Sequence, residues 1–200
     1  MQTLSIKGDK TKMYICSEAY KLFAEKGFKE VTMQDICRKT DLSRGGLYRH
    51  YENTAQIFSA VISGMMAEQE DEFSEKIHSS MPAAQILDDV LNRYEEEMLD
   101  SGNSLSVAIY EYFSSPGISQ YDDSILQQYL YSKKMWTELI TYGMRTGEFK
   151  IVDPAAVFDL IVFSYQGVRM YSRLMPVHRD IPRGITGQIR NLLLSESEIR

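Results

Sequence analysis

Apolar residues recur at intervals of three and four positions along almost the whole chain, which is the period of one face of an α-helix. Strand-like alternation does not occur, and the sequence contains no repeat of fixed period. Pro and Gly fall mainly between the periodic segments rather than inside them. The pattern therefore predicts an all-α fold.

Two helices are predicted near the N-terminus. The first covers residues 10–26, and Gly27 is its C-terminal stop. The second begins at Thr32, because its hydroxyl can cap a helix while Asp35, three residues on, completes a capping box. This second helix ends near Thr40. The buried faces are Ile15, Ala19, Leu22 and Phe23 in the first helix and Met33, Ile36 and Cys37 in the second.

A tight corner and another short helix follow at once. Asp41 and Leu42 form the corner, since Asp tolerates unusual backbone angles better than most residues, and Ser43 can cap the next helix. At about 100° per residue, Ser43, Leu47 and Tyr51 share one side and are expected to pack on the first two helices. This arrangement is typical of a recognition helix in the major groove of DNA. The outward residues are then Gly45, Tyr48 and Arg49.

Two adjacent glycines lie in this short helix. Each of Gly45 and Gly46 costs roughly 0.5–1 kcal/mol relative to Ala in a helix interior. The simplest explanation for this cost is that residues without a side chain let the helix approach DNA closely. The alternative is a loose turn in an ordinary helical protein.

The charge is polarised along the chain. Residues 1–60 hold ten Lys or Arg and seven Asp or Glu, a net charge of +3, whereas residues 61–200 carry −9. A basic head on an acidic body can approach phosphates with the head alone, and chance scatter of solvated charge is the alternative.

Composition also bears on the compartment. The longest apolar stretch, residues 155–163, contains Asp159 and is far shorter than the roughly 20 residues that span a bilayer. The first residues contain no export signal, so a cytoplasmic protein without a membrane partner is expected. Cys16 and Cys37 fall at apolar helical positions, which favours free thiols over a disulfide.

Catalytic and metal-binding patterns are missing from the sequence. The three histidines, at 50, 78 and 178, lie far apart and lack neighbouring ligands at metal-site spacings. The sequence also has no phosphate-binding glycine loop and no nucleophile elbow. We therefore expect no enzymatic activity, no cofactor and no metal site.

The N-terminal motifs closely resemble those of TetR-family regulators, the tetracycline-repressor-like proteins. The resemblance rests on Gly27-Phe28, Val31-Thr32-Met33, Asp35-Ile36, Leu42-Ser43, Gly45, Leu47-Tyr48, His50-Tyr51 and Ile57-Phe58. It implies a three-helix DNA-binding head with a helix-turn-helix, at residues 1–52, and a larger helical effector-binding and dimerisation body, at residues 53–200. About nine helices are expected in total.

The resemblance also identifies candidate DNA-binding residues, with two departures from the family pattern. Thr54 replaces a Lys that usually contacts phosphate, and Gly46 replaces a side chain that often reads bases, so readout rests on Arg44, Tyr48 and Arg49. His50 is either a phosphate contact or an ordinary histidine at a helix end. The candidate set is Thr32, Arg44, Gly45, Gly46, Tyr48, Arg49, His50 and Thr54.

The body is predicted to begin with a long helix over residues 53–79, capped by Asn53 with Gln56 in the capping-box position. A later helix, residues 154–174, is apolar on more than one face, so one face can serve the core and the other a partner chain. With the helix at 183–194 it would form a four-helix dimer interface, as the resemblance also implies. The expected interface residues are Phe158, Val162, Tyr165, Ile185, Ile189, Leu192 and Leu193.

Aromatic and Met side chains of the body suggest an adaptable effector cavity, although aromatic residues at helical spacing are more often plain core. Glu95, Glu96, Glu97 and Glu111 either face a cationic aromatic effector or form a solvated face. The candidate lining is Tyr94, Met98, Tyr110, Phe113, Trp136, Ile140, Met144, Phe163 and Tyr165.

These observations predict a homodimeric repressor that binds a palindromic operator in double-stranded DNA and is released by a small hydrophobic or aromatic effector. The alternative is a DNA-binding architectural or scaffold protein of the same fold that takes no ligand. An internal cavity in the body would favour the repressor.

Overall fold

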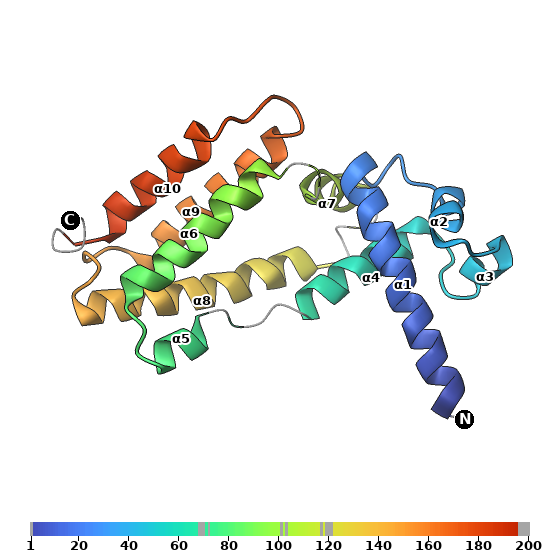
Figure 1. Ribbon diagram of the computed structural model, residues 1–200, viewed down its shortest axis with the longest axis horizontal. Coiled ribbons are helices and arrows are strands. Elements are labelled where there is room, and N and C mark those ends of the chain that lie inside the picture. Colours follow the sequence, from blue (N-terminus) through green and yellow to red (C-terminus); the bar gives the residue numbers. More distant parts are fainter. Residues whose placement is uncertain are drawn as a thin grey trace. The chain divides into compact units, whose positions relative to one another are not determined.

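The computed structural model describes residues 2–67, 71, 73–100, 102, 104–116, 118 and 122–195. Within these residues the chain is helical, with no strand and a single isolated bridge between Phe149 and Leu194, which confirms the all-α prediction. Ten helices are present there, one more than expected (Figure 1). They are α1 (Gln2–Lys26), α2 (Met33–Thr40), α3 (Arg44–Tyr48), α4 (Thr54–Ala67), α5 (Ser74–His78), α6 (Ala83–Leu99), α7 (Ser106–Phe113), α8 (Ser124–Thr146), α9 (Pro154–Tyr171) and α10 (Asp180–Leu193).

Two predicted helix boundaries are wrong. The first helix begins at Gln2 rather than at residue 10. The long helix predicted over residues 53–79 is two helices, α4 and α5. The second of these starts afresh because the Asp71 carboxylate accepts hydrogen bonds from the backbone N–H groups of Phe73, at 3.2 Å, and Ser74, at 2.9 Å.

The chain divides into two compact units, Met1–Glu68 with Gly102–Asp123, and Gln69–Ser101 with Ser124–Arg200. In the first unit, Phe58 of α4 packs edge-on against Phe23 of α1, with ring centroids 4.8 Å apart. Tyr112 of α7 lies 4.9 Å from Phe58. Because α4 and α7 supply apolar side chains to this core, the division does not follow the expected boundary after residue 52.

The second unit is built on α6, α8, α9 and α10, and Figure 1 shows these helices running alongside one another. Its core contains Leu87 and Leu91 of α6, Leu139 of α8, and Leu193 of α10, all fully buried. Gly143 is required for this packing, since a Cβ there would lie 2.3 Å from the Phe149 ring. None of the helices in the described part of the chain is both long and apolar enough to cross a bilayer.

Candidate nucleic-acid interface and ligand cavity

The corner between α2 and α3 has the predicted geometry. Asp41 ends α2 in the left-handed region, with φ 55° and ψ 21°. Ser43 then caps α3, and its Oγ accepts a hydrogen bond from the Gly46 backbone N–H at 3.1 Å. A left-handed residue followed closely by an N-cap reverses the chain within a few positions, so α2 and α3 form a helix-turn-helix.

A capping box begins α2. The Asp35 N–H donates to Thr32 Oγ1 at 3.2 Å, and the Thr32 N–H donates to Asp35 Oδ2 at 3.0 Å. The Thr32 hydroxyl also donates to Asp35 Oδ2, and this bond is the main reason that the pKa of Asp35 falls to about 2. Asp35 is therefore charged at neutral pH, where a carboxylate stabilises the N-terminal end of a helix.

The short helix α3 is anchored by two apolar contacts. Leu47 is fully buried, and Tyr51, just after the helix, is buried with its hydroxyl 3.3 Å from Cys16 Sγ. Burial raises the pKa of Tyr51, so its hydroxyl stays neutral. The orientation predicted from the helical period is confirmed for these two side chains. It is wrong for Ser43, which is exposed because it caps the helix.

The opposite side of α3 is exposed, as predicted. Arg44, Gly45, Tyr48 and Arg49 are all exposed. The Arg44 guanidinium lies 5.4 Å from the centre of the Tyr48 ring, a cation–π distance that holds both side chains at the surface. A Cβ on Gly45 would meet nothing within 4 Å, so the local packing does not require glycine at this position.

The remaining candidate residues flank α3. Thr32 is exposed at the start of α2, and Gly46 and His50 are half-buried. Thr54, also half-buried, is the first residue of α4. The Asn53 cap is present, since Asn53 Oδ1 accepts from the Gln56 N–H at 2.9 Å. All eight predicted residues thus lie in one compact unit.

Sequence reasoning missed the role of Glu111. Its Oε2 on α7 accepts hydrogen bonds from the backbone N–H groups of Phe28, at 2.7 Å, and Lys29, at 3.0 Å. The carboxylate fits against Gly27, whose φ is +82°, because a Cβ there would lie 2.7 Å from Glu111 Oε2. Glu111 therefore positions the turn between α1 and α2. The sequence could not predict this contact, because its partners are more than eighty positions apart. The one local signal was Gly27, which marks the turn.

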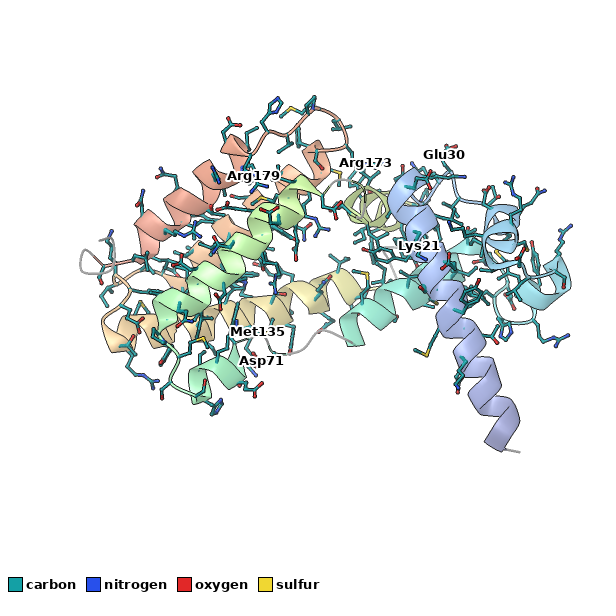
Figure 2. The ribbon with its side chains drawn as sticks, viewed as in Figure 1. Lys21, Glu30, Asp71, Met135, Arg173 and Arg179 are labelled. Atoms are coloured by element: carbon teal, nitrogen blue, oxygen red, sulfur yellow. The ribbon has the colours of Figure 1, made fainter. Side chains whose placement is uncertain are left out.

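The second unit contains a cavity of about 600 Å³, lined by α5 with the residues before it, α6, α8 and α9. Two of its lining residues, Asp71 before α5 and Met135 on α8, are labelled in Figure 2. A cavity of this size accommodates a drug-sized molecule. The apolar part of the lining is Phe73, Tyr94, Met135, Trp136, Phe158, Ile161, Val162 and Tyr165.

One wall of the cavity is a chain of polar contacts. The Tyr165 hydroxyl donates to the Glu97 carboxylate and accepts from Arg169 Nη1 at 2.5 Å. Arg93 Nε lies 3.3 Å from the other Glu97 oxygen. The Tyr94 ring stacks on Tyr165, with centroids 4.3 Å apart. Burial is the main cause that raises the pKa of Tyr165, so this hydroxyl remains neutral and can bridge the two charged groups.

Of the nine residues predicted to line the effector cavity, Tyr94, Trp136 and Tyr165 do so. Met98 and Ile140 are buried, and Met144 packs against the core of the unit. Phe163 is 66% exposed on the outer side of α9. Tyr110 and Phe113 belong to the other compact unit, on α7. Helical spacing alone did not distinguish cavity lining from core or surface.

The four glutamates have separate roles. Glu97 lines the cavity, whereas Glu95 accepts a hydrogen bond from Thr186 and faces Arg190. Glu96 is exposed and pairs with Arg179, labelled in Figure 2, at 2.6 Å. Glu111 belongs to the first unit. Neither the shared effector site nor the purely solvated face predicted for this set is present.

The outward face of α9 differs from the predicted one. Phe158 and Tyr165, expected at a dimer interface, are 1% and 9% exposed within their own chain. Ile189 and Leu193 of α10 are also buried, while Val162 and Ile185 are half-buried. Because α9 is apolar all round, the sequence pattern could not select the face that packs inward. The exposed apolar residues of α9 and α10 are Leu160, Phe163, Tyr171 and Leu192.

Residues 15–61 match the family model of bacterial regulatory proteins, tetR family. This match covers the helix-turn-helix together with α1 from residue 15 onward and α4 as far as residue 61. Residues 15–61 are thus the DNA-binding segment of the TetR family. The resemblance seen in the N-terminal motifs is thereby confirmed.

Two named relatives are also transcriptional regulators. The chain is 27% identical over 156 residues to the uncharacterized HTH-type transcriptional regulator YfiR of Bacillus subtilis, covering 74% of this chain and 72% of YfiR. It is 22% identical over 130 residues to the HTH-type transcriptional repressor KstR2 of Rhodococcus jostii, covering 64% of this chain and 63% of KstR2. These matches agree with the prediction that the chain is a DNA-binding regulator rather than an enzyme.

Solved structures share the fold of this chain. A TetR-family transcriptional regulator from Agrobacterium tumefaciens superposes with a TM-score of 0.78 at 12% identity, over 94% of this chain and all of the other. Regulatory protein TetR from Rhodobacter sphaeroides gives a TM-score of 0.74 at 15% identity, over 91% and 98% of the two chains. At these identities the comparison supports the all-α fold alone.

Proposed function

We propose that this TetR-family regulator is a homodimeric repressor that binds a palindromic operator through α3 and is released by a small molecule in the cavity of its second unit. The observation that carries the DNA-binding part is the exposed face of α3. There Arg44, Tyr48 and Arg49 project from a helix whose other side is held by Leu47. Arginine side chains beside a small residue suit the major groove, where guanine edges accept hydrogen bonds.

The dimer is supported by the apolar face of α9 and α10. Leu160, Phe163 and Tyr171 are 60%, 66% and 58% exposed on one helix, and Leu192 adds to them from the next. Two shallow apolar grooves run along the same helices. Such a contiguous apolar surface marks an interaction site, and a second copy of the chain offers a matching one across a two-fold axis.

The cavity favours effector control over the ligand-independent alternative. A purely architectural DNA-binding protein has no need for a space of about 600 Å³ lined by Trp136 and Tyr165. Release follows if the effector binds better to the conformation with lower operator affinity, since binding at the two sites is thermodynamically linked.

Selection of bound sequences from a random pool of double-stranded DNA tests the proposal. A two-fold dimer predicts an inverted repeat whose half-sites are about one helical turn apart or slightly more. Affinity for the selected site should fall steeply between roughly 50 and 200 mM salt, because phosphate contacts release counterions. A consensus without an inverted repeat, or an affinity indifferent to salt, would contradict it.

A further inference from the structure

The polar wall of the cavity contains an arginine with unused hydrogen-bonding capacity. Arg169 is half-buried and has five N–H donors, of which one, on Nη1, bonds the Tyr165 hydroxyl. Its Nε is buried and has no hydrogen-bond partner. In the described part of the chain no carboxylate lies within 4.0 Å of this guanidinium. A buried donor without an acceptor is costly, so this guanidinium is not fully satisfied by the protein. Because Arg169 lines the cavity, its remaining Nη1 and Nη2 donors are the ones that a ligand would contact.

The other cations of the lining already have carboxylate partners. Lys76 Nζ lies 3.4 Å from Asp89 Oδ2, and Arg93 Nε lies 3.3 Å from Glu97 Oε1. Arg93 contacts Glu97 directly, and the Tyr165 hydroxyl links Glu97 to Arg169, so these three described residues bring two positive charges and one negative charge to this corner of the cavity. A single negative charge on a ligand would balance it.

The acidic residues of the lining are less suited to a cationic ligand. Glu97 is already engaged by Arg93 and by the Tyr165 hydroxyl. Asp71 is occupied with the first N–H groups of α5. Glu75, the remaining acid among the described lining residues, is exposed. An ammonium group would therefore have to displace an existing bond to reach Glu97.

We propose that the effector is an amphiphilic carboxylate, with its anionic group on Arg169 and its apolar body against Trp136 and Phe73. This inference rests on the proposed function, because it assigns the chemistry of the effector that releases the operator. The Arg169 guanidinium has the planar fork that pairs with a carboxylate through two parallel bonds. Phe73 and Trp136 are 1% and 3% exposed and pack edge-on, with centroids 5.3 Å apart, so they offer a rigid apolar wall.

Three probes of matched shape test the proposal on the full chain: 4-phenylbutanoate, 4-phenylbutanamide and 4-phenylbutylammonium. Trp136 is the one tryptophan of the sequence and lines the cavity, so its fluorescence reports binding at this site. We expect the carboxylate to bind about tenfold more tightly than the amide, as a charge-assisted hydrogen bond predicts. The ammonium should bind most weakly.

Variants then assign the preference to Arg169. Arg169→Gln should abolish the roughly tenfold preference for the carboxylate, and Arg169→Lys should retain part of it. Lys76→Gln is the matched control, because this cation lines the same cavity but is paired with Asp89. It should leave the preference unchanged. Thermal unfolding of each variant shows that the fold is intact.

Three outcomes would overturn the proposal: tighter binding of the ammonium probe, an unchanged preference in Arg169→Gln, or no response of Trp136 to any probe at millimolar concentration. Operator binding by the unmodified chain is measured in parallel. Failure to bind any selected DNA refutes the proposed repressor function. Normal DNA binding without carboxylate preference refutes only the assignment of the effector.

Discussion

Glu111 Oε2 lies 2.7 Å from the backbone nitrogen of Phe28, 83 positions earlier in the chain, and accepts its hydrogen bond. Removing the acceptor leaves this N–H and that of Lys29 unpaired. Glu111→Ala should therefore lower the free energy of unfolding by about 1–3 kcal/mol. Chemical denaturation measures this change. Tyr110→Ala, at an exposed neighbouring position on α7, is the control and should have little effect.

Gly45 offers a test of close approach to DNA. A Cβ on Gly45 meets nothing within 4 Å, so Gly45→Ala should leave the fold intact or stabilise it by about 0.5–1 kcal/mol. Operator affinity should nevertheless fall if the helix backbone lies close to the groove. Gly64→Ala on α4, where a Cβ is also unobstructed, is the matched control and should leave DNA binding unchanged. Unaltered operator affinity in Gly45→Ala would show that this glycine does not face DNA.

Arg49 and Tyr48 should contribute unequally to DNA binding. Arg49→Ala should cost about 1–3 kcal/mol of specific binding if the guanidinium reads a guanine. Tyr48→Phe removes only a hydroxyl and should cost less, through a phosphate contact. Both residues are exposed, so both variants should fold. Fluorescence anisotropy with selected and scrambled operators separates specific from general DNA binding. Normal operator affinity in both variants would show that another surface reads the DNA sequence.

Phe163 should be central to dimerisation. It is 66% exposed on α9, and Phe163→Glu would place like charges against each other across a two-fold interface. Sedimentation should then detect monomers, and operator binding should be lost with the dimer. Ile151→Glu introduces the same charge at an 85% exposed position outside α9 and α10 and should remain dimeric. Dimers of unchanged affinity in Phe163→Glu would place the interface on another surface.

Asp35 should make the stability of the first unit sensitive to acid. Its pKa of about 2 lies below the ordinary value of 3.8, so the folded state favours the charged form. The stabilisation is complete above about pH 4 and is lost as the pH falls toward about 2. Asp35→Asn should reduce the stability at neutral pH and flatten its decline in acid. Denaturant unfolding measures the free energy of unfolding at each pH. If this free energy falls equally steeply in acid for the unmodified protein and for Asp35→Asn, the linkage is contradicted.

Features that depend on neighbouring residues were predictable from the sequence. Thr32 and Asp35 are three positions apart, and Ser43 and Gly46 likewise, so the start of α2 and of α3 followed from capping chemistry. The left-handed corner at Asp41 followed from the same local logic. Leu47 pointed inward because helical period and polarity agree over this short segment.

Only the tertiary structure decided two kinds of feature. One is the buried face of a helix that has apolar residues on several sides, and the other is a contact between residues far apart in the sequence. On α9, apolar residues occur on every side, and packing against α6, α8 and α10 buried Phe158 and Tyr165 while leaving Phe163 outside. The contact of Glu111 with the α1–α2 turn and the position of Arg169 beside Tyr165 depend on which helices meet in space. The sequence determined the all-α class and the caps of α2 and α3, because these arise from interactions within a few residues. The cavity and the outward face required the packing of helices far apart in the chain.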